Sequence, residues 1–282
     1  MSSSDSIQRA ADRHATPTLA AKRRTGWTAK QIGSQLLGPA AIVVFLIIWE
    51  VLVRVMEVPA YILSTPSQIA VVVYEDLVSG VVFPHFMVTL QEVVVGFAIA
   101  TIGGVLLGTV IGLVPWINRT LYPMLLAVQT IPKIALAPLF LIWFGFGITS
   151  KIVTVAVIVF FPIMVNVIAG IQTVDPRRLL LMRALGATPL ETYIKVRFPS
   201  MLPFLFAGLE VAIIFSVTGA IVAEFIGASV GLGSMIIQRQ STSYVAGVFS
   251  ILFYLTVMGL SLNAILRWIG NYFCSWARVK ES

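Results

Sequence analysis

Long apolar runs limit what this chain can fold into more than any other feature of its sequence. Six of them run approximately over residues 36–55, 88–113, 121–144, 152–171, 202–225 and 244–269. A helix needs about 20 predominantly apolar residues to cross the hydrocarbon core of a bilayer. The runs therefore predict an all-α integral membrane protein with six transmembrane helices.

The composition supports a membrane protein and argues against a soluble one. Only 11% of the 282 residues are charged, whereas 58% are hydrophobic. A soluble domain carries roughly 25% charged residues, so most of this protein's surface must face the lipid bilayer. The formal net charge is +7, but the basic residues lie between the apolar runs and form no single patch. This distribution argues against nucleic-acid binding.

Residues suited to metal binding or catalysis are scarce. The one cysteine, Cys274, excludes an internal disulfide and a multi-cysteine metal site. The two histidines, His14 and His85, lie in an expected tail and an expected loop and share no metal-ligand spacing. Nothing resembles a catalytic triad or a paired-carboxylate site. We therefore expect no metal site, no cofactor bound by this chain and no enzyme activity.

The distribution of Lys and Arg predicts the orientation in the membrane. Residues 1–35 carry six basic residues, the connection over residues 172–200 carries five, and residues 273–282 carry two. Cytoplasmic connections are enriched in Lys and Arg. We therefore expect a cytoplasmic N-terminal tail (1–35), a membrane domain (36–272) and a cytoplasmic C-terminal tail (273–282).

The first external connection contains the signals of a short helix. Thr65 followed by Pro66 is typical of an N-cap and a first helical position. The pattern predicts a helix through residues 68–78 that ends near Gly80. Such a helix could lie along the membrane surface or pack against the bundle.

Glycines in the second run predict a close helix contact. Gly104, Gly108 and Gly112 recur every four residues and so lie on one face of a helix. Small residues at this spacing let a second helix approach closely. We interpret the face as ordinary helix packing, with a moving interface as the alternative.

The third run is interrupted by three prolines and holds one lysine. Pro123, Pro132 and Pro138 must bend or break the helix. Lys133 lies within the interruption, where a broken helix could present a cation to an anionic substrate. A structural pair between Lys133 and a carboxylate is the alternative.

Other polar residues in the runs are pathway candidates, because polar groups within a membrane are costly. Gln129 and Asn166 could line a pathway or form interhelical hydrogen bonds. We expect Glu210 to pair with a basic residue, and direct contact with substrate is the alternative. Glu92, near the external start of its run, we expect to reach the membrane surface.

The connection between the fourth and fifth runs predicts a compact cytoplasmic projection. A short helix over residues 179–185 is expected to close at Gly186, which suits a left-handed C-terminal position. A second helix is expected from Pro189 to Val196, and Pro199 is expected to begin the next span. Membrane insertion alone does not require two such helices.

This connection resembles the cytoplasmic signature loop of ABC importer permeases. That loop reads Glu-Ala-Ala, three residues, Gly, nine residues, Ile-x-Leu-Pro, and Leu180, Leu181 and Met182 replace its first three residues here. Gly186 matches the glycine at the expected spacing. The resemblance implies that the loop couples the permease to an ATPase through Arg183, Ala184, Gly186, Ala187, Val196, Phe198 and Pro199.

The resemblance extends over roughly residues 60–270. Segments 64–69, 131–147 and 219–233 are similar to those of nitrate, taurine and aliphatic-sulfonate permeases. The family implies the type I ABC importer fold, a homodimer in the bacterial inner membrane, ABC ATPase subunits that bind ATP and Mg, and a periplasmic solute-binding protein. It also implies a small anionic solute of the nitrate, sulfonate or taurine type.

Two other classes compete with this interpretation. A secondary transporter driven by an ion gradient usually shows internal repeats and paired broken spans, and no clear repeat is present. A membrane enzyme would need clustered His, Asp or Glu. The nearest approach to a phosphate-binding loop, residues 145–152, has Ser150 at the second glycine and Ile152 at the Ser or Thr that would hold Mg. An ATP-driven transporter would therefore need a separate ATPase subunit.

Overall fold

The computed structural model describes residues 29–274, and all regular elements in that range are helices. The chain divides into two units, residues 1–49 and 50–282, which are described separately. The predicted tails lie mostly outside the described residues. Helix α2 (Ala29–Val55) contains the first apolar run but begins before it, at Ala29, because residues 29–37 are rich in helix formers.

Helix α3 (Pro66–Ser79) confirms the short helix predicted in the first external connection. The Thr65 hydroxyl accepts a hydrogen bond from the Gln68 amide, and the Gln68 side chain accepts one from the Thr65 amide at 3.1 Å. This capping box fixes the start of the helix. Gly80 ends it at φ +73°, a backbone conformation that favours glycine. The helix packs against α12.

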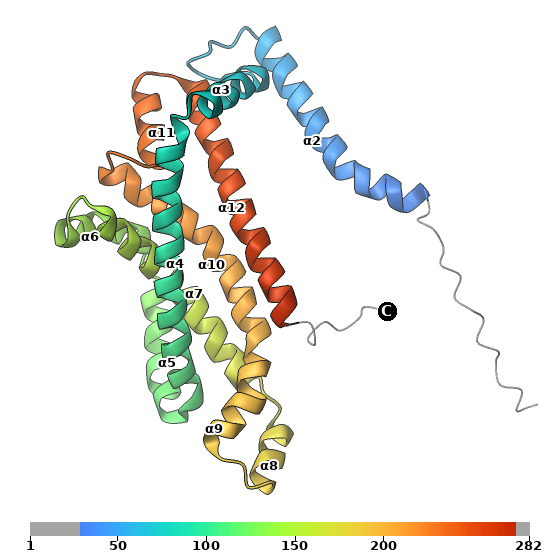
Figure 1. Ribbon diagram of the computed structural model, residues 1–282, viewed down its shortest axis with the longest axis vertical. Coiled ribbons are helices and arrows are strands. Elements are labelled where there is room, and N and C mark those ends of the chain that lie inside the picture. The colour runs from blue at the N-terminus through green and yellow to red at the C-terminus, as the bar shows by residue number, and fades with distance from the viewer. Residues whose placement is uncertain (1–28, 275–282) are drawn as a thin grey trace, which may run out of the picture. The chain divides into compact units, whose positions relative to one another are not determined.

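Four long helices form the bundle of the second unit (Figure 1): α4 (Val82–Leu113), α7 (Ile148–Gln172), α10 (Phe198–Gly227) and α12 (Val245–Phe273). Helix α7 packs along both α4 and α10, and the largest hydrophobic core lies between them. His85, expected in a loop, lies in the first turn of α4.

The α4–α7 contact confirms that the glycine face packs closely against another helix. A Cβ atom on Gly108 would lie 2.8 Å from Val167 Cγ1 and 2.9 Å from the Met164 carbonyl oxygen. One on Gly104 would lie 3.0 Å from Ile163 Cγ2. Glycine is therefore required for the backbones to approach this closely.

The third run is broken at Pro132, as predicted, whereas Pro123 lies inside a helix and does not end it. Helix α5 (Pro115–Gln129) is followed by a 3₁₀ turn, η2 (Lys133–Leu136), and by α6 (Ala137–Phe144). The two arms are bent by 79°. Within the described residues, four helices and this bent pair are long and apolar enough to cross a membrane. The sixth predicted crossing falls on α2, so the count of six remains a prediction.

The predicted projection forms, but its boundaries differ. Helix α8 (Pro176–Ala184) begins earlier than expected, because the Asp175 carboxylate accepts from the Arg177 amide at 2.8 Å as an N-cap. Helix α9 (Pro189–Thr192) then continues through a π-helical turn, η3 (Tyr193–Arg197), into α10. The expected new start at Pro199 is therefore wrong.

The π-helical turn explains why Pro199 does not break the helix. The Phe198 amide bonds to the Tyr193 carbonyl five residues earlier. A proline lacks an amide hydrogen, and here the wider π-helical turn lies directly before it. Residues 189–227 consequently form one continuous helix of 39 residues. A further short helix, α11 (Leu232–Ser241), which the sequence did not predict, connects α10 to α12.

Candidate functional site

The turn between α8 and α9 is formed by the conformation and backbone hydrogen bonds of residues at the end of α8. Gly186 adopts φ +70°, its amide donates to the Arg183 carbonyl at 3.0 Å, and the Ala187 amide donates to the Met182 carbonyl at 3.0 Å. These two bonds form a Schellman motif, which requires a left-handed residue after the helix. A Cβ on Gly186 would meet nothing within 4 Å. Its substitution would therefore strain the backbone without a steric clash.

The start of α9 is fixed as firmly as the end of α8. The Thr188 hydroxyl accepts from the Glu191 amide, and the Glu191 carboxylate accepts from the Thr188 amide at 2.8 Å. Lys195 lies 3.6 Å from the same carboxylate. The two short helices thus form a defined turn at the end of the bundle opposite α3 and α11 (Figure 1).

The residues predicted for the projection fall into two groups. Arg183, Ala184, Gly186 and Ala187 lie at the turn, whereas Val196, Phe198 and Pro199 lie on the continuous helix that leaves it. Several leucines of the projection face outward, among them Leu180 and Leu181, each 60% exposed. Large exposed apolar side chains on a projection are typical of a protein-docking surface.

The predicted pathway residues do not form one cluster. Lys133 and Gln129 meet at the break between α5 and α6, where Lys133 Nζ donates to the Gln129 carbonyl at 3.1 Å and lies 4.9 Å from the centre of the Phe161 ring. No carboxylate lies within ion-pair distance of Lys133 in the part of the chain that the structure describes. The predicted alternative, a lysine–carboxylate pair, is therefore wrong.

The other two pathway candidates have partners of their own. Asn166 Nδ2 donates to the Pro162 carbonyl at 2.8 Å within α7, so its bond is intrahelical rather than interhelical. Glu210 accepts from Arg267 Nε at 3.2 Å, which confirms the expected basic partner. This ion pair is exposed and lies between α10 and α12.

A buried charge cluster at the α3–α11 end was missed by the sequence analysis. Glu92 on α4 is completely buried, and its Oε1 atom lies 3.5 Å from Lys151 Nζ on α7. The expectation that Glu92 reaches the membrane surface is therefore wrong. Helix α7 begins at Ile148, so Lys151 lies in its first turn and faces α4 instead of belonging to a loop.

A second buried carboxylate, Glu224 on α10, belongs to the same cluster. Thr89 Oγ1 donates to its Oε1 atom at 2.6 Å, and the Gly233 amide donates to its Oε2 atom at 2.5 Å. His85 Nδ1 lies 2.9 Å from the Gly231 carbonyl oxygen. These contacts tie the segment after α10 to the first turns of α4.

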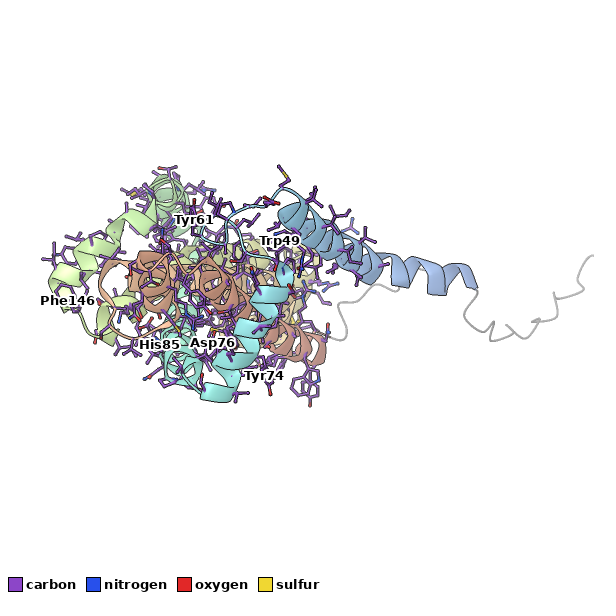
Figure 2. All side chains as sticks on the ribbon, turned by 90° about the horizontal axis from the view of Figure 1, so that it is seen from above. Trp49, Tyr61, Tyr74, Asp76, His85 and Phe146 are labelled. Atoms are coloured by element: carbon purple, nitrogen blue, oxygen red, sulfur yellow. The ribbon has the colours of Figure 1, made fainter. Side chains whose placement is uncertain are left out.

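A second ion pair joins α3 to α11. Arg239 donates to both carboxylate oxygens of Asp76, at 2.8 and 2.5 Å, and to Ser250 Oγ at 2.6 Å. Figure 2 shows Tyr74 on the outer side of α3, whereas Asp76 lies over the bundle. Bidentate pairing of this kind fixes geometry as well as charge. The sequence had placed both partners in connections, where neither gave a signal of pairing.

An all-helical bundle with one broken span and a two-helix projection is typical of a polytopic membrane transport protein. Residues 100–273 match the family of binding-protein-dependent transport system inner membrane components. This match covers more than half of the chain, which therefore belongs to that family. The chain is accordingly a multi-pass membrane permease subunit of an ABC importer, and not an enzyme.

Curated relatives agree with this family. The formylaminopyrimidine transport permease of Halalkalibacterium halodurans is 34% identical over 83% of this chain and 92% of its own length. The riboflavin transport system permease of Chloroflexus aurantiacus is 31% identical over 93% of this chain and 95% of its own length. A putative aliphatic-sulfonate permease of Bacillus subtilis is 30% identical over 92% of this chain and 91% of its own length.

A solved structure supports the fold. An inward-facing methionine ABC transporter matches with a TM-score of 0.58 at 21% identity and covers 68% of this chain and 94% of that chain. The type I permease fold predicted from the sequence is thus confirmed, and the family favours ATP-driven import over the ion-gradient alternative.

Proposed function

We propose that two copies of this chain form the membrane pathway of an importer for a small anionic solute. A periplasmic binding protein delivers the solute, and two ABC ATPase subunits that bind ATP and Mg drive the transport. In this proposal both termini and the α8–α9 projection lie on the cytoplasmic side of a bacterial inner membrane. The Lys and Arg residues of the projection support this orientation.

The continuity of α9 with α10 carries the proposal for coupling. A force on the projection acts directly on a helix of 39 residues, Pro189–Gly227, which extends to the opposite end of the bundle. Glu224, near that end, is bonded to α4 and α11. Movement of the ATPase subunits can thus reach the external end through one rigid element. Leu180 and Leu181 supply the apolar surface on which an ATPase subunit docks.

The environment of Lys133 supports an anionic solute. The ammonium group lies at a helix break and has no carboxylate partner among the described residues, so its charge is available to a ligand. Relatives named for aliphatic sulfonates, nitrate and taurine are 30%, 27% and 25% identical to this chain. Lys133→Ala should lower uptake of the anion while the protein accumulates normally in the membrane.

A neutral heteroaromatic solute is the second candidate. The relatives named for formylaminopyrimidine and riboflavin transport are 34% and 31% identical. The ligand retained by the partner binding protein separates the two candidates. A neutral ligand, together with normal uptake by Lys133→Ala, would remove the argument for an anion.

Gly186→Val tests the coupling role of the projection. Alanine in a left-handed conformation costs about 1 kcal/mol, and a β-branched residue costs more. The variant should insert at normal levels, but it should lose its ATPase subunits or hydrolyse ATP without transport. Co-purification of the ATPase and measurement of solute uptake distinguish these outcomes.

Gly80→Val is the matched control. Gly80 has nearly the same backbone conformation, φ +73°, and a Cβ there would meet only Phe83, at 3.9 Å. It lies at the end of α3, on the opposite side of the bundle from the projection. The control should keep its ATPase subunits. Full ATPase retention and normal uptake by Gly186→Val would show that the projection does not couple the two subunits.

A further inference from the structure

A cavity of about 290 Å³ lies between the projection and the end of α4. Two arginines line it, Arg183 from α8 and Arg197 from the π-helical turn, together with Leu113, the last residue of α4, and Leu179. The cavity therefore combines two cationic side chains with an apolar wall. Arg183 belongs to the residues predicted to couple the permease to an ATPase, whereas Arg197 does not, and that role does not explain why the two side chains share a cavity.

The two arginines have no anionic partner in the part of the chain that the structure covers. The acidic residues of the same connection are engaged elsewhere: Asp175 caps α8, and Glu191 accepts from Thr188 and lies beside Lys195. Two uncompensated guanidinium groups on one cavity repel each other, and an anion between them would remove that cost.

The chemistry of the two side chains favours a phosphate group. Guanidinium groups present paired donors that match phosphate oxygens, and they are more weakly hydrated than ammonium groups. Leu113 ends an apolar span, so in the proposed orientation the cavity lies where α4 leaves the cytoplasmic face of the membrane. Basic pockets at this level, beside apolar spans, suit anionic lipid headgroups.

The cavity and the apolar docking surface lie on different faces of α8. Leu179 and Arg183 are four residues apart and so share one face, and both line the cavity beside α4. Leu180 and Leu181 are each 60% exposed and do not line it. An ATPase subunit docked on Leu180 and Leu181 would therefore leave the cavity uncovered.

We propose that Arg183 and Arg197 bind the phosphate group of an anionic phospholipid, and that the bound lipid holds the α8–α9 projection against the end of α4. The proposal rests on the cytoplasmic orientation given under Proposed function. It adds to that function a lipid site that stabilises the coupling element in the position from which it meets the ATPase.

Native mass spectrometry of the full-length permease, purified without ATPase subunits, tests the proposal. Phosphatidylglycerol, phosphatidylcholine and inorganic phosphate are titrated separately. Phosphatidylglycerol should bind best, and Arg183→Gln and Arg197→Gln should each weaken it about tenfold, the effect of one lost charge-assisted contact. Arg183→Lys should retain part of the affinity, because the charge remains.

Arg177→Gln and Arg178→Gln are the matched controls. Both positions are exposed on α8, and neither lines the cavity. Each should bind phosphatidylglycerol as the wild type does. An equal loss of phosphatidylglycerol binding in these controls would show that the lipid responds only to general surface charge, and it would overturn the proposal. Unchanged binding by Arg183→Gln and Arg197→Gln would also overturn it.

Two further outcomes concern the source of the phosphate and the identity of the occupant. Binding of inorganic phosphate with no preference for phosphatidylglycerol would assign the cavity to a free anion rather than a lipid. Displacement of the bound lipid by added ATPase subunits would assign it to an acidic residue of the ATPase. Because lipid binding is measured without the ATPase, failure of this proposal is distinguishable from failure of coupling.

Discussion

Lys151→Met should destabilise the protein strongly, because Lys151 is the cation of a buried cluster. Its ammonium group lies 3.5 Å from the carboxylate of Glu92, and the two side chains are 7% and 0% exposed. Glu224 adds a second buried carboxylate at the same end of α4. Methionine keeps the length of the side chain, so the variant removes the charge with little change in packing.

The expected loss of stability follows from the buried carboxylates that remain after the substitution. Removal of one partner of a buried ion pair costs at most about 3–5 kcal/mol, the full value applying when the other group stays charged. At about 2–4 °C per kcal/mol for a chain of this size, the apparent unfolding midpoint should fall by several degrees and by at most roughly 20 °C. The midpoint is measured in detergent at a fixed heating rate, because an apparent midpoint depends on the heating rate when unfolding is irreversible.

Two comparisons isolate the cause of the loss. Arg267→Met removes the cation of an exposed pair with Glu210, in which the side chains are 62% and 37% exposed. Such a pair contributes only about 0–1 kcal/mol, so the midpoint should move little. Lys151→Met combined with Glu92→Leu should recover part of the lost stability, because the Glu92 carboxylate is then gone, whereas Glu224 stays buried with its bonds to Thr89 and Gly233. A midpoint for Lys151→Met within the range of Arg267→Met would refute the interpretation of the cluster.

Further predictions concern packing and orientation. Gly108→Ala should lower stability and assembly measurably, since its Cβ would lie 2.9 Å from a backbone oxygen of α7, whereas Gly103→Ala should be tolerated, since its Cβ would lie 3.5 Å from Phe160. Thermal unfolding of the two variants provides the comparison. In a background without the native cysteine, cysteines at Ser79 and Ser243 should react with an impermeant reagent from outside intact cells, and one at Ser2 should not. Labelling at Ser2 would contradict the proposed orientation.

Local signals in the sequence determined much of this protein. The length and hydrophobicity of the runs predicted a helical membrane protein, because a spanning chain must satisfy its backbone hydrogen bonds within each segment. Thr65, Pro66 and Gly80 predicted α3, and Gly186 predicted the turn after α8, since capping depends on residues within a few positions of the helix end. The prolines of the third run predicted its break for the same reason.

Only the tertiary structure decided which distant side chains meet. Glu92 and Lys151, like Asp76 and Arg239, come from different helices, and from the sequence each of them is expected only at a span end or in a connection. Their pairing depends on the register with which α4 packs on α7 and α3 packs on its neighbours, which no local pattern encodes. The cavity lined by Arg183 and Arg197 also arises this way, because Arg183 from α8 and Arg197 from the π-helical turn both come to lie at the end of α4.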